Sequence, residues 1–285
     1  MTWFTEALYA DPSHEGYAQT FYVLRELVRR QTDFQELVIF ETPHHGRVLA
    51  LDGVIQATEK DEFVYHEMLA HVPLFALGSP KRVLVIGGGD GGILREVLRH
   101  PVEQVRLVEI DGTVVDLCRQ YLPSLSAGAF DDPRAQVTIG DGIRFVAETT
   151  ETFDLIIVDS TDPAGPGEGL FTEAFYADCK KRLAPGGLVV TQNGVPHFQP
   201  QELARCGRRL KPHFADVSCY LVVVPTYVGG FMALGWATDD AGLRKLTEAD
   251  LAPRFARTGF STRYYSPAVH AAAFALPPFI AKLVA

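Results

Sequence analysis

Residues 82–92 read RVLVIGGGDGG, and this stretch decides the fold. Its unbroken apolar run is typical of a strand buried on both faces, which occurs in parallel sheets covered by helices. Gly87, Gly89 and Gly92 then satisfy the GxGxxG pattern, and the residues after them predict a helix. A strand, a glycine-rich turn and a helix in this order predict a nucleoside-binding site in a Rossmann-type domain.

Acidic residues around the glycine turn restrict which nucleoside fits. Glu109 ends the next predicted strand 22 residues after Gly87, the spacing expected of an acid that hydrogen-bonds a ribose diol. Asp90 lies inside the turn, where it would face the phosphates of a dinucleotide, and like charges about 4 Å apart repel by roughly 4 kcal/mol. A cationic sulfonium nucleoside has no such conflict, so NAD is a distant alternative. A role for Asp90 as a simple helix N-cap is the second alternative.

The segments on either side of this turn predict two domains. Residues 17–58 read as strands joined by tight turns, with Asp52-Gly53 as a two-residue hairpin turn. Downstream, five short apolar strands alternate with helices and a closing hairpin follows, which predicts a mostly parallel seven-stranded sheet. The predicted fold class is α/β, with a small N-terminal antiparallel β domain at 1–60 and a methyltransferase-like Rossmann domain at 61–285. The predicted strands are Arg82–Ile86, Val105–Ile110, Gln136–Ile139, Asp154–Val158, Gly187–Gln192, Val217–Val224 and Gly230–Ala237.

The composition argues against several classes of function. A net charge of −9 over 285 residues disfavours nucleic acid, whose phosphates need a clustered basic face. The N-terminus has neither the basic nor the apolar region of a signal peptide, and no apolar run approaches the ~20 residues that span a membrane. The four cysteines lack metal-ligand spacing and are typical of buried thiols in a reducing compartment. We therefore expect a cytoplasmic protein without a membrane segment.

Several acids follow strand ends of the predicted sheet. Asp159 and Asp162 come after the fourth parallel strand, and ligands of open α/β sheets bind at this edge. They would share one crevice with Asp90 and Glu109, and such a cluster needs a positive partner. No His or Cys joins the motif at ligand spacing, so we favour organic cations over a metal, with an ordinary Asp-Pro turn as the alternative. Asp141 would accept from an adenine amino group, or serve as an Asx-turn or helix cap.

Six ordered segments together carry a resemblance to a known family: GVIQ at 53–56, DEFVYHE at 61–67, VIGGGDG at 85–91, VEID at 108–111, DSTDP at 159–163 and PTY at 225–227. With these segments the sequence resembles the spermidine synthases, a family of aminopropyltransferases, over nearly its whole length. The family implies transfer of an aminopropyl group from decarboxylated S-adenosylmethionine, a co-substrate, to putrescine, which gives spermidine and 5'-methylthioadenosine without a prosthetic group. It also implies a homodimer or homotetramer.

The resemblance also implies a role for individual residues. Asp159 would be the proton acceptor, assisted by Tyr65, and Asp90 would bind the ammonium of the aminopropyl group. At His66 some relatives carry Gln, and without the resemblance Tyr65 and His66 would read as core and surface of one helix. The nucleoside would be held by Gln35, Gly87, Gly89, Asp90, Glu109, Asp141, Gly142 and Pro166. The diamine would contact Gln56, Tyr65, His66, Asp90, Asp159, Asp162 and Tyr227.

Two rival functions stay open at this point. One is an N-methyltransferase that uses intact S-adenosylmethionine on the same fold, and the other is a non-catalytic nucleoside-binding regulator. The sequence also leaves the acceptor open among putrescine, cadaverine, agmatine and spermidine, because the length of the channel depends on loop packing.

Overall fold

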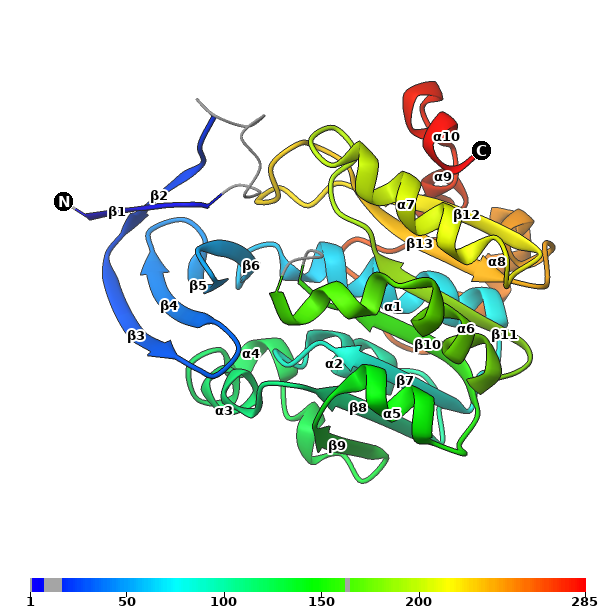
Figure 1. Cartoon of the computed structure of the whole chain (residues 1–285), viewed down its shortest axis with the longest axis horizontal. Coiled ribbons are helices and arrows are strands. Elements are labelled where there is room, and N and C mark those ends of the chain that lie inside the picture. The colour runs from blue at the N-terminus through cyan, green and yellow to red at the C-terminus, as the bar shows by residue number, and fades with distance from the viewer. Residues whose placement is uncertain (1, 8–16, 162–164) are drawn as a thin grey trace.

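The computed structural model describes residues 2–7, 17–161 and 165–285. Figure 1 shows the N-terminal strands at one end of the molecule and a larger body of helices and strands at the other. Strands β1 and β2 form a two-stranded antiparallel sheet, and β3 to β6 form a four-stranded antiparallel sheet in chain order. The predicted small antiparallel N-terminal part is confirmed, although β1 lies upstream of the predicted strands. The bounds are Thr2–Thr5 (β1), Thr20–Val23 (β2), Arg25–Gln31 (β3), Glu36–Thr42 (β4), Gly46–Leu51 (β5) and Val54–Thr58 (β6).

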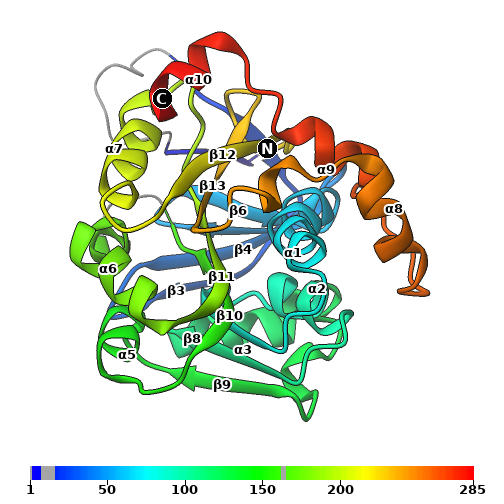
Figure 2. The same cartoon turned by 90° about the vertical axis from the view of Figure 1, so that its right-hand side faces the viewer.

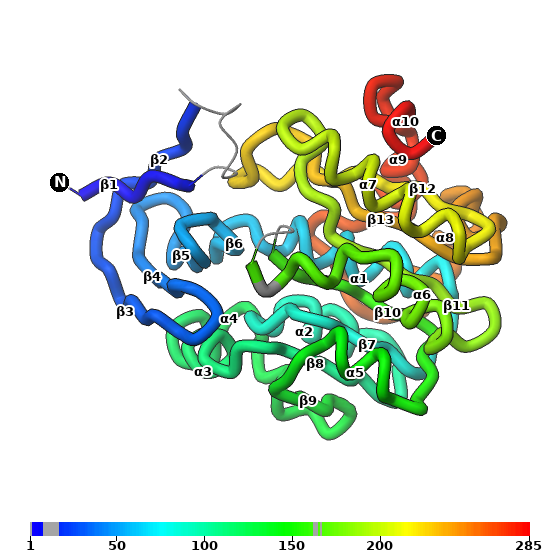
Figure 3. The backbone as a smooth tube through the Cα atoms, in the orientation of Figure 1, coloured from blue at the N-terminus to red at the C-terminus, as the bar shows by residue number. Residues whose placement is uncertain are grey.

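The hairpin between β5 and β6 turns on Asp52 and Gly53, as predicted. Leu51 pairs with Val54, so two residues complete the turn. Both have positive φ, 47° at Asp52 and 78° at Gly53, and turns of this kind match the right-handed twist of the flanking strands. The chain then runs from β6 directly into helix α1, Glu62–Leu77, which lies in the centre of the larger body (Figure 3).

The larger body is built on a seven-stranded sheet in the order β12-β13-β11-β10-β7-β8-β9. Strands β7 to β11 pair in parallel, whereas β12 and β13 form an antiparallel hairpin that joins the sheet at β11. The predicted mostly parallel Rossmann-like sheet is confirmed. The strand order reverses between β7 and β10, because β8 and β9 extend the sheet to one side and β10 and β11 to the other. The bounds are Arg82–Gly87 (β7), Gln104–Glu109 (β8), Ala135–Ile139 (β9), Phe153–Asp159 (β10), Leu183–Gln192 (β11), Asp216–Val222 (β12) and Met232–Thr238 (β13).

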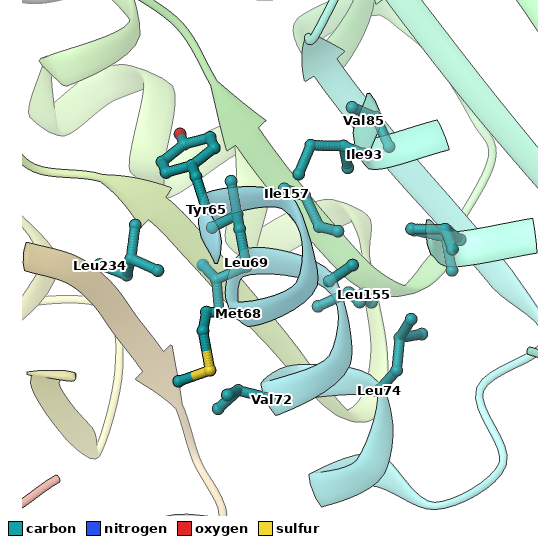
Figure 4. Close-up of a cluster of buried hydrophobic side chains, with 14 of the residues drawn as sticks. Tyr65, Met68, Leu69, Val72, Leu74, Val85, Ile93, Leu155, Ile157 and Leu234 are labelled. Carbon is teal, nitrogen blue, oxygen red and sulfur yellow. The ribbon is translucent and has the colours of Figure 1, made fainter. Parts of the chain in front are cut away.

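Helices cover both faces of this sheet, because successive side chains of a strand point to opposite sides. Val83 and Val85 of β7 pack with α1 and α2, whereas Leu84 and Ile86 pack with α5, α6 and α7. Figure 2 shows these two helix layers with the sheet between them, and Figure 4 shows α1 presenting Leu69 to the sheet. The bounds are Gly92–Leu98 (α2), Gly142–Glu148 (α5), Glu173–Arg182 (α6) and Pro200–Leu210 (α7).

A separate apolar cluster joins the four-stranded sheet to the larger body. Leu37 and Leu49 of that sheet pack with Val114 and Cys118 of α3, Gly112–Tyr121, and with residues around α4, Pro123–Ser126. Because α3 begins just after β8, this contact fixes the N-terminal sheet beside the carboxyl ends of the parallel strands. All four cysteines are buried, as predicted.

The C-terminal part adds helices that the sequence analysis did not predict: α8, Glu248–Ala256, α9, Pro267–Ala273, and α10, Pro278–Val284. Ile280 of α10 packs with Leu203 of α7 in one apolar cluster. Among the described residues, no single helix has the length and apolar character to cross a membrane. Only α9 and α10 taken together meet those two criteria, and they are bent by 70°.

Candidate active site

One cavity of about 290 Å³ opens at the carboxyl ends of β7, β8 and β10. It lies at the point where the strand order reverses, which is where open α/β sheets bind ligands. Pro166 lies in the short helix η3, Gly165–Phe171, whose Gly165 and Gly167 line the cavity. Asp162 lies outside the described residues. The other predicted site residues all line the cavity: Gln35, Gln56, Tyr65, His66, Gly87, Gly89, Asp90, Glu109, Asp141, Gly142, Asp159 and Tyr227.

The glycine turn lies directly against the end of β10. Gly87 pairs with Asp159 in the parallel register, and its φ is 81°. A Cβ on Gly87 would lie 2.0 Å from the carbonyl oxygen of Asp159, and the N–H of Gly88 donates to that same oxygen at 3.0 Å. Only glycine combines this backbone conformation with this approach. The first glycine of the motif therefore places the Asp90 loop beside Asp159.

Glu109 is buried at the end of β8. Its Oε1 accepts from the N–H of Asp111 at 2.9 Å, and a Cβ on Gly89 would lie 2.8 Å from its Oε2. Burial raises the pKa of Glu109 to about 7, although the N–H groups of Asp111 and Gly89 oppose the rise. The amide of Gln35 donates to Oδ2 of Asp111 at 3.2 Å, so Gln35 is held at the same end of the cavity.

Two of the predicted acids hold the start of a helix while they line the cavity. Oδ1 of Asp141 accepts from the N–H groups of Ile143 at 2.8 Å and Arg144 at 3.3 Å, so the helix-cap alternative for Asp141 is confirmed. Oδ1 of Asp90 accepts from the N–H of Gly92 at 2.7 Å. Neither bond uses the second carboxylate oxygen, which at Asp90 lies 3.4 Å from Nε2 of His66.

Asp159 forms a close pair with Tyr65 of α1. The hydroxyl of Tyr65 donates to Oδ1 of Asp159 at 2.7 Å. Burial raises the pKa of Asp159 to about 6, the carboxylate of Asp90 adds to the rise, and His66 and Tyr65 oppose it. The pKa of Tyr65 is raised well above its usual value by burial and by Asp159, so its hydroxyl keeps its proton. A carboxylate of this kind can accept a proton near neutral pH.

His66 is buried, in contrast to its reading as a surface residue from helical spacing alone. Its Nδ1 lies 2.5 Å from Oε2 of Glu62, and its Nε2 lies 3.4 Å from Oδ2 of Asp90. A Cβ on Gly92 would lie 2.2 Å from the imidazole ring, so the third glycine of the motif makes room for it. Burial lowers the pKa of His66, but Asp90 and Glu62 outweigh it and raise the value to about 10.

The opposite wall of the cavity is held by contacts between distant segments. The hydroxyl of Tyr227, in the loop between β12 and β13, donates to the carbonyl of Gln56 at 2.5 Å. Next to it, Thr226 donates its N–H at 2.9 Å and its hydroxyl at 2.7 Å to Oδ2 of the buried Asp61. The rings of Tyr65 and Tyr227 meet edge to face with centroids 5.9 Å apart. The acid that precedes α1 therefore fixes the loop that carries Tyr227.

Sequence reasoning missed at least two polar residues of the cavity. Glu6 is buried just after β1, lines the cavity, and accepts from the N–H of Ile55 at 2.9 Å. No local pattern marks a single acid so far from its partner along the chain. Gln192 also lines the cavity, and its position at the end of β11 is a signal that the strand-end rule could have used.

Comparisons with known proteins agree with one another. Residues 62–246 match the model of a family described as spermine/spermidine synthase domain, and residues 2–59 match one described as spermidine synthase tetramerisation domain. A polyamine aminopropyltransferase of Yersinia pestis (strain Pestoides F) is 53% identical over 274 residues, which cover 96% of this chain and 93% of the relative. Two solved structures of spermidine synthases also match this chain.

The first is a spermidine synthase in complex with the transition-state analogue AdoDATO, with a TM-score of 0.92 and 40% identity. The second is the spermidine synthase of Thermotoga maritima, with a TM-score of 0.88 and 38% identity. Each comparison covers 99% of this chain and 94% of the other.

Proposed function

The chain belongs to the spermine/spermidine synthase family and is an aminopropyltransferase, and we propose that it transfers the aminopropyl group of decarboxylated S-adenosylmethionine to putrescine. The products are spermidine and 5'-methylthioadenosine, and no prosthetic group takes part. One observation carries the proposal: the hydrogen-bonded pair of Tyr65 and Asp159 lies directly against the glycine turn that carries Asp90. A proton acceptor and a site for a cationic nucleoside thus share one cavity.

The aminopropyl donor occupies the end of the cavity formed by the glycine turn and Glu109. Glu109 accepts from the ribose hydroxyls, and Asp90 pairs with the ammonium of the aminopropyl group. The proximity of Gly89 to Glu109 supports this placement, because a side chain at Gly89 would fill the space beside the carboxylate. The remaining groups that we assign to the nucleoside are Gln35, Gly87, Asp141, Gly142 and Pro166.

The acceptor amine attacks the carbon next to the sulfonium. The amine lone pair forms the new C–N bond as the C–S bond breaks, and the released electron pair leaves the sulfur neutral in 5'-methylthioadenosine. An alkylammonium with a pKa near ~10 has no lone pair, and freeing it at neutral pH requires about 4 kcal/mol. Asp159 accepts the proton that the nitrogen loses, and the hydroxyl of Tyr65 holds the carboxylate in position. Alignment of the two substrates supplies much of the remaining acceleration.

The diamine lies in the channel that leads to Asp159 from the N-terminal sheet. We assign the lining of this channel to Gln56, Tyr65, His66, Asp90, Asp159, Asp162 and Tyr227. Placement of Gln56, Tyr65 and Tyr227 on one wall supports this assignment. The buried acid Glu6 adds a negative group on the same side.

We propose a boundary between the two domains at residue 60, since β6 ends at Thr58 and α1 begins at Glu62. We also propose a homodimer or homotetramer assembled through the N-terminal domain. The exposed Trp3 and Leu24 on that domain support it, together with the description of the family model that matches it. The buried, unpaired cysteines fit a cytoplasmic enzyme.

An assay of purified enzyme with two donors and several amines tests the function. We expect spermidine from decarboxylated S-adenosylmethionine and putrescine, and no methylated product from the intact donor. Cadaverine, agmatine and spermidine serve as competing acceptors. Product formation only with intact S-adenosylmethionine would contradict the proposal and favour an N-methyltransferase.

A further inference from the structure

His66 lies between two carboxylates that approach it from different parts of the chain. Glu62 lies one helical turn before it on α1, so the i and i+4 side chains share a face. Asp90 approaches from the glycine turn, on the other side of the ring. The distances are 2.5 Å from Nδ1 to Glu62 and 3.4 Å from Nε2 to Asp90. Glu62 and His66 are both buried, at 8% and 2% exposure, so water does not replace these partners.

This geometry fits one protonation state of the ring. A neutral imidazole has one N–H and one lone pair, so one of its nitrogens would face a carboxylate without a proton. The imidazolium donates from Nδ1 to Glu62, and its Nε2 forms an ion pair with Asp90 at 3.4 Å. The titratable and charged groups that face it are Glu62 and Tyr65 on α1, Asp90 in the glycine turn, Arg95 on α2, Asp159 on β10 and Tyr227 in the β12–β13 loop. Among these groups, the carboxylates of Glu62, Asp90 and Asp159 outnumber the one cation besides His66, which is Arg95.

Glu62 is itself held in place from the far side. Arg95 donates to both of its oxygens, from Nη2 at 2.9 Å and from Nη1 at 3.2 Å. The same guanidinium donates to the carbonyl of Leu125 at 2.7 Å, which fixes its position. A fork of this kind orients a carboxylate as well as attracting it. One oxygen of Glu62 therefore points at Nδ1 of His66.

We propose that Glu62, oriented by Arg95, is a positioning residue that keeps His66 as an imidazolium directed at Asp90. This role rests on the proposed function and adds to it two residues that do not line the substrate channel as assigned above. The imidazolium keeps Asp90 ionised although Asp90 is close to Asp159. It also adds a fixed positive charge near the acceptor amine, and such a charge favours the free amine over the ammonium.

Nuclear magnetic resonance of the wild-type enzyme tests the charge state directly. The protein is labelled with ¹⁵N-histidine, and the His66 signals are assigned by their loss in His66→Gln. We expect both ring nitrogens of His66 to be protonated from about pH 6 to about pH 8.5. A neutral ring at pH 7 in the free enzyme would overturn the proposal, whatever the enzyme's activity.

The variant Glu62→Gln tests the positioning role. We expect the pKa of His66 to fall by about two units. The ratio of wild-type to variant kcat/KM should then grow roughly tenfold between about pH 7 and about pH 9, as the ring loses its proton. Glu96→Gln is the matched control, because Glu96 is an equally buried acid that accepts from Nε of Arg95 at 2.7 Å without contacting His66. It should leave the titration of His66 unchanged.

A double-mutant cycle separates this role from a general effect on folding. In a His66→Gln background, Glu62→Gln should change kcat/KM at about pH 9 by less than about twofold. A full, additive loss there would show that Glu62 does not act through His66 and would overturn the proposal. If no aminopropyl transfer is observed at all, the proposed function fails, while the histidine titration still decides the charge state.

Discussion

The two ends of the cavity are held by different kinds of structure. The donor end, which we define as Gly87, Glu109 and Asp141, consists of residues at the carboxyl ends of three parallel strands or in the turn that follows. The acceptor end, which we define as Gln56 and Tyr227 with their neighbours, takes residues from segments far apart in the sequence. The first depends on local strand and turn geometry, and the second on hydrogen bonds across the fold.

This difference has an energetic consequence. At the donor end, a parallel register and a glycine with positive φ fix the backbone itself, as between Gly87 and Asp159. At the acceptor end, side-chain contacts between distant segments hold the wall, such as Tyr227 to Gln56 and Thr226 to Asp61. One hydrogen bond makes a net contribution of about 0.5–1.5 kcal/mol. Loss of one contact at the acceptor end should therefore weaken the binding of one substrate by a modest factor.

The largest effect is expected where the two ends meet, at Asp159. Asp159→Asn keeps the shape of the side chain but cannot accept a proton, so kcat should fall by at least ~10²-fold. The affinity for the aminopropyl donor should fall less. Steady-state kinetics and calorimetry at about pH 7.5 measure both quantities.

The control for this variant is Asp154→Asn on the same strand. Oδ2 of Asp154 accepts from the N–H groups of Lys81 and Arg82, on the opposite edge of the sheet from the cavity. Its removal should leave kcat nearly unchanged. An Asp159→Asn enzyme with near wild-type kcat would remove Asp159 from the mechanism.

The next largest effect concerns the choice between two donors. In the proposed binding mode, decarboxylated S-adenosylmethionine presents an ammonium to Asp90, whereas the intact donor would also present a carboxylate that Asp90 and Asp159 repel. A difference of ~2 kcal/mol corresponds to roughly thirtyfold in affinity. Asp90→Asn should reduce the difference in affinity between the two donors, chiefly because it weakens binding of the decarboxylated donor. Calorimetry measures both affinities. Equal affinity of the wild type for both donors would contradict the assignment of Asp90.

A smaller effect at the donor end depends on pH. The pKa of Glu109 is raised to about 7, so the free enzyme carries the proton below that pH and the carboxylate above it. We propose that the ionised carboxylate accepts from the ribose hydroxyls, so affinity for the nucleoside should be present above about pH 7 and lost as the pH falls. Binding of 5'-methylthioadenosine should weaken about tenfold from about pH 8 to about pH 6. The variant Glu109→Gln should bind 5'-methylthioadenosine weakly, with an affinity that does not change with pH. If the affinity of the wild type were equally independent of pH, Glu109 would not have this role.

The donor end was predictable from the sequence because its residues follow one another in a strand, a turn and a helix. The glycine pattern located Gly87 and Gly89, and the spacing located Glu109, before any family was considered. The sheet could be predicted for the same reason, since its strands are short apolar runs. The helices after β13 were not predicted, because their apolar residues pack against distant elements, as Ile280 does against Leu203.

The acceptor end could be predicted only through the family resemblance. Spacing places Tyr65 and His66 side by side on one helix but does not show that both are buried beneath other segments. His66 needs Gly92 to leave room for its ring, and Tyr227 needs Asp61 to hold its loop. Such requirements connect residues through the folded structure, so no local pattern in the chain records them.

The smallest effect tests a single contact of the acceptor end. Tyr227→Phe removes the hydroxyl that donates to the carbonyl of Gln56 and leaves that carbonyl without this partner. At about 0.5–1.5 kcal/mol for the bond, KM for putrescine should rise by roughly two- to tenfold. The affinity for 5'-methylthioadenosine should not change, because strand register and turn geometry fix the backbone of the donor end without this hydrogen bond. Tyr264→Phe, a partly buried tyrosine that does not line the cavity, is the control. If Tyr227→Phe weakened both ligands equally, the two ends would be coupled and the distinction between them would be wrong.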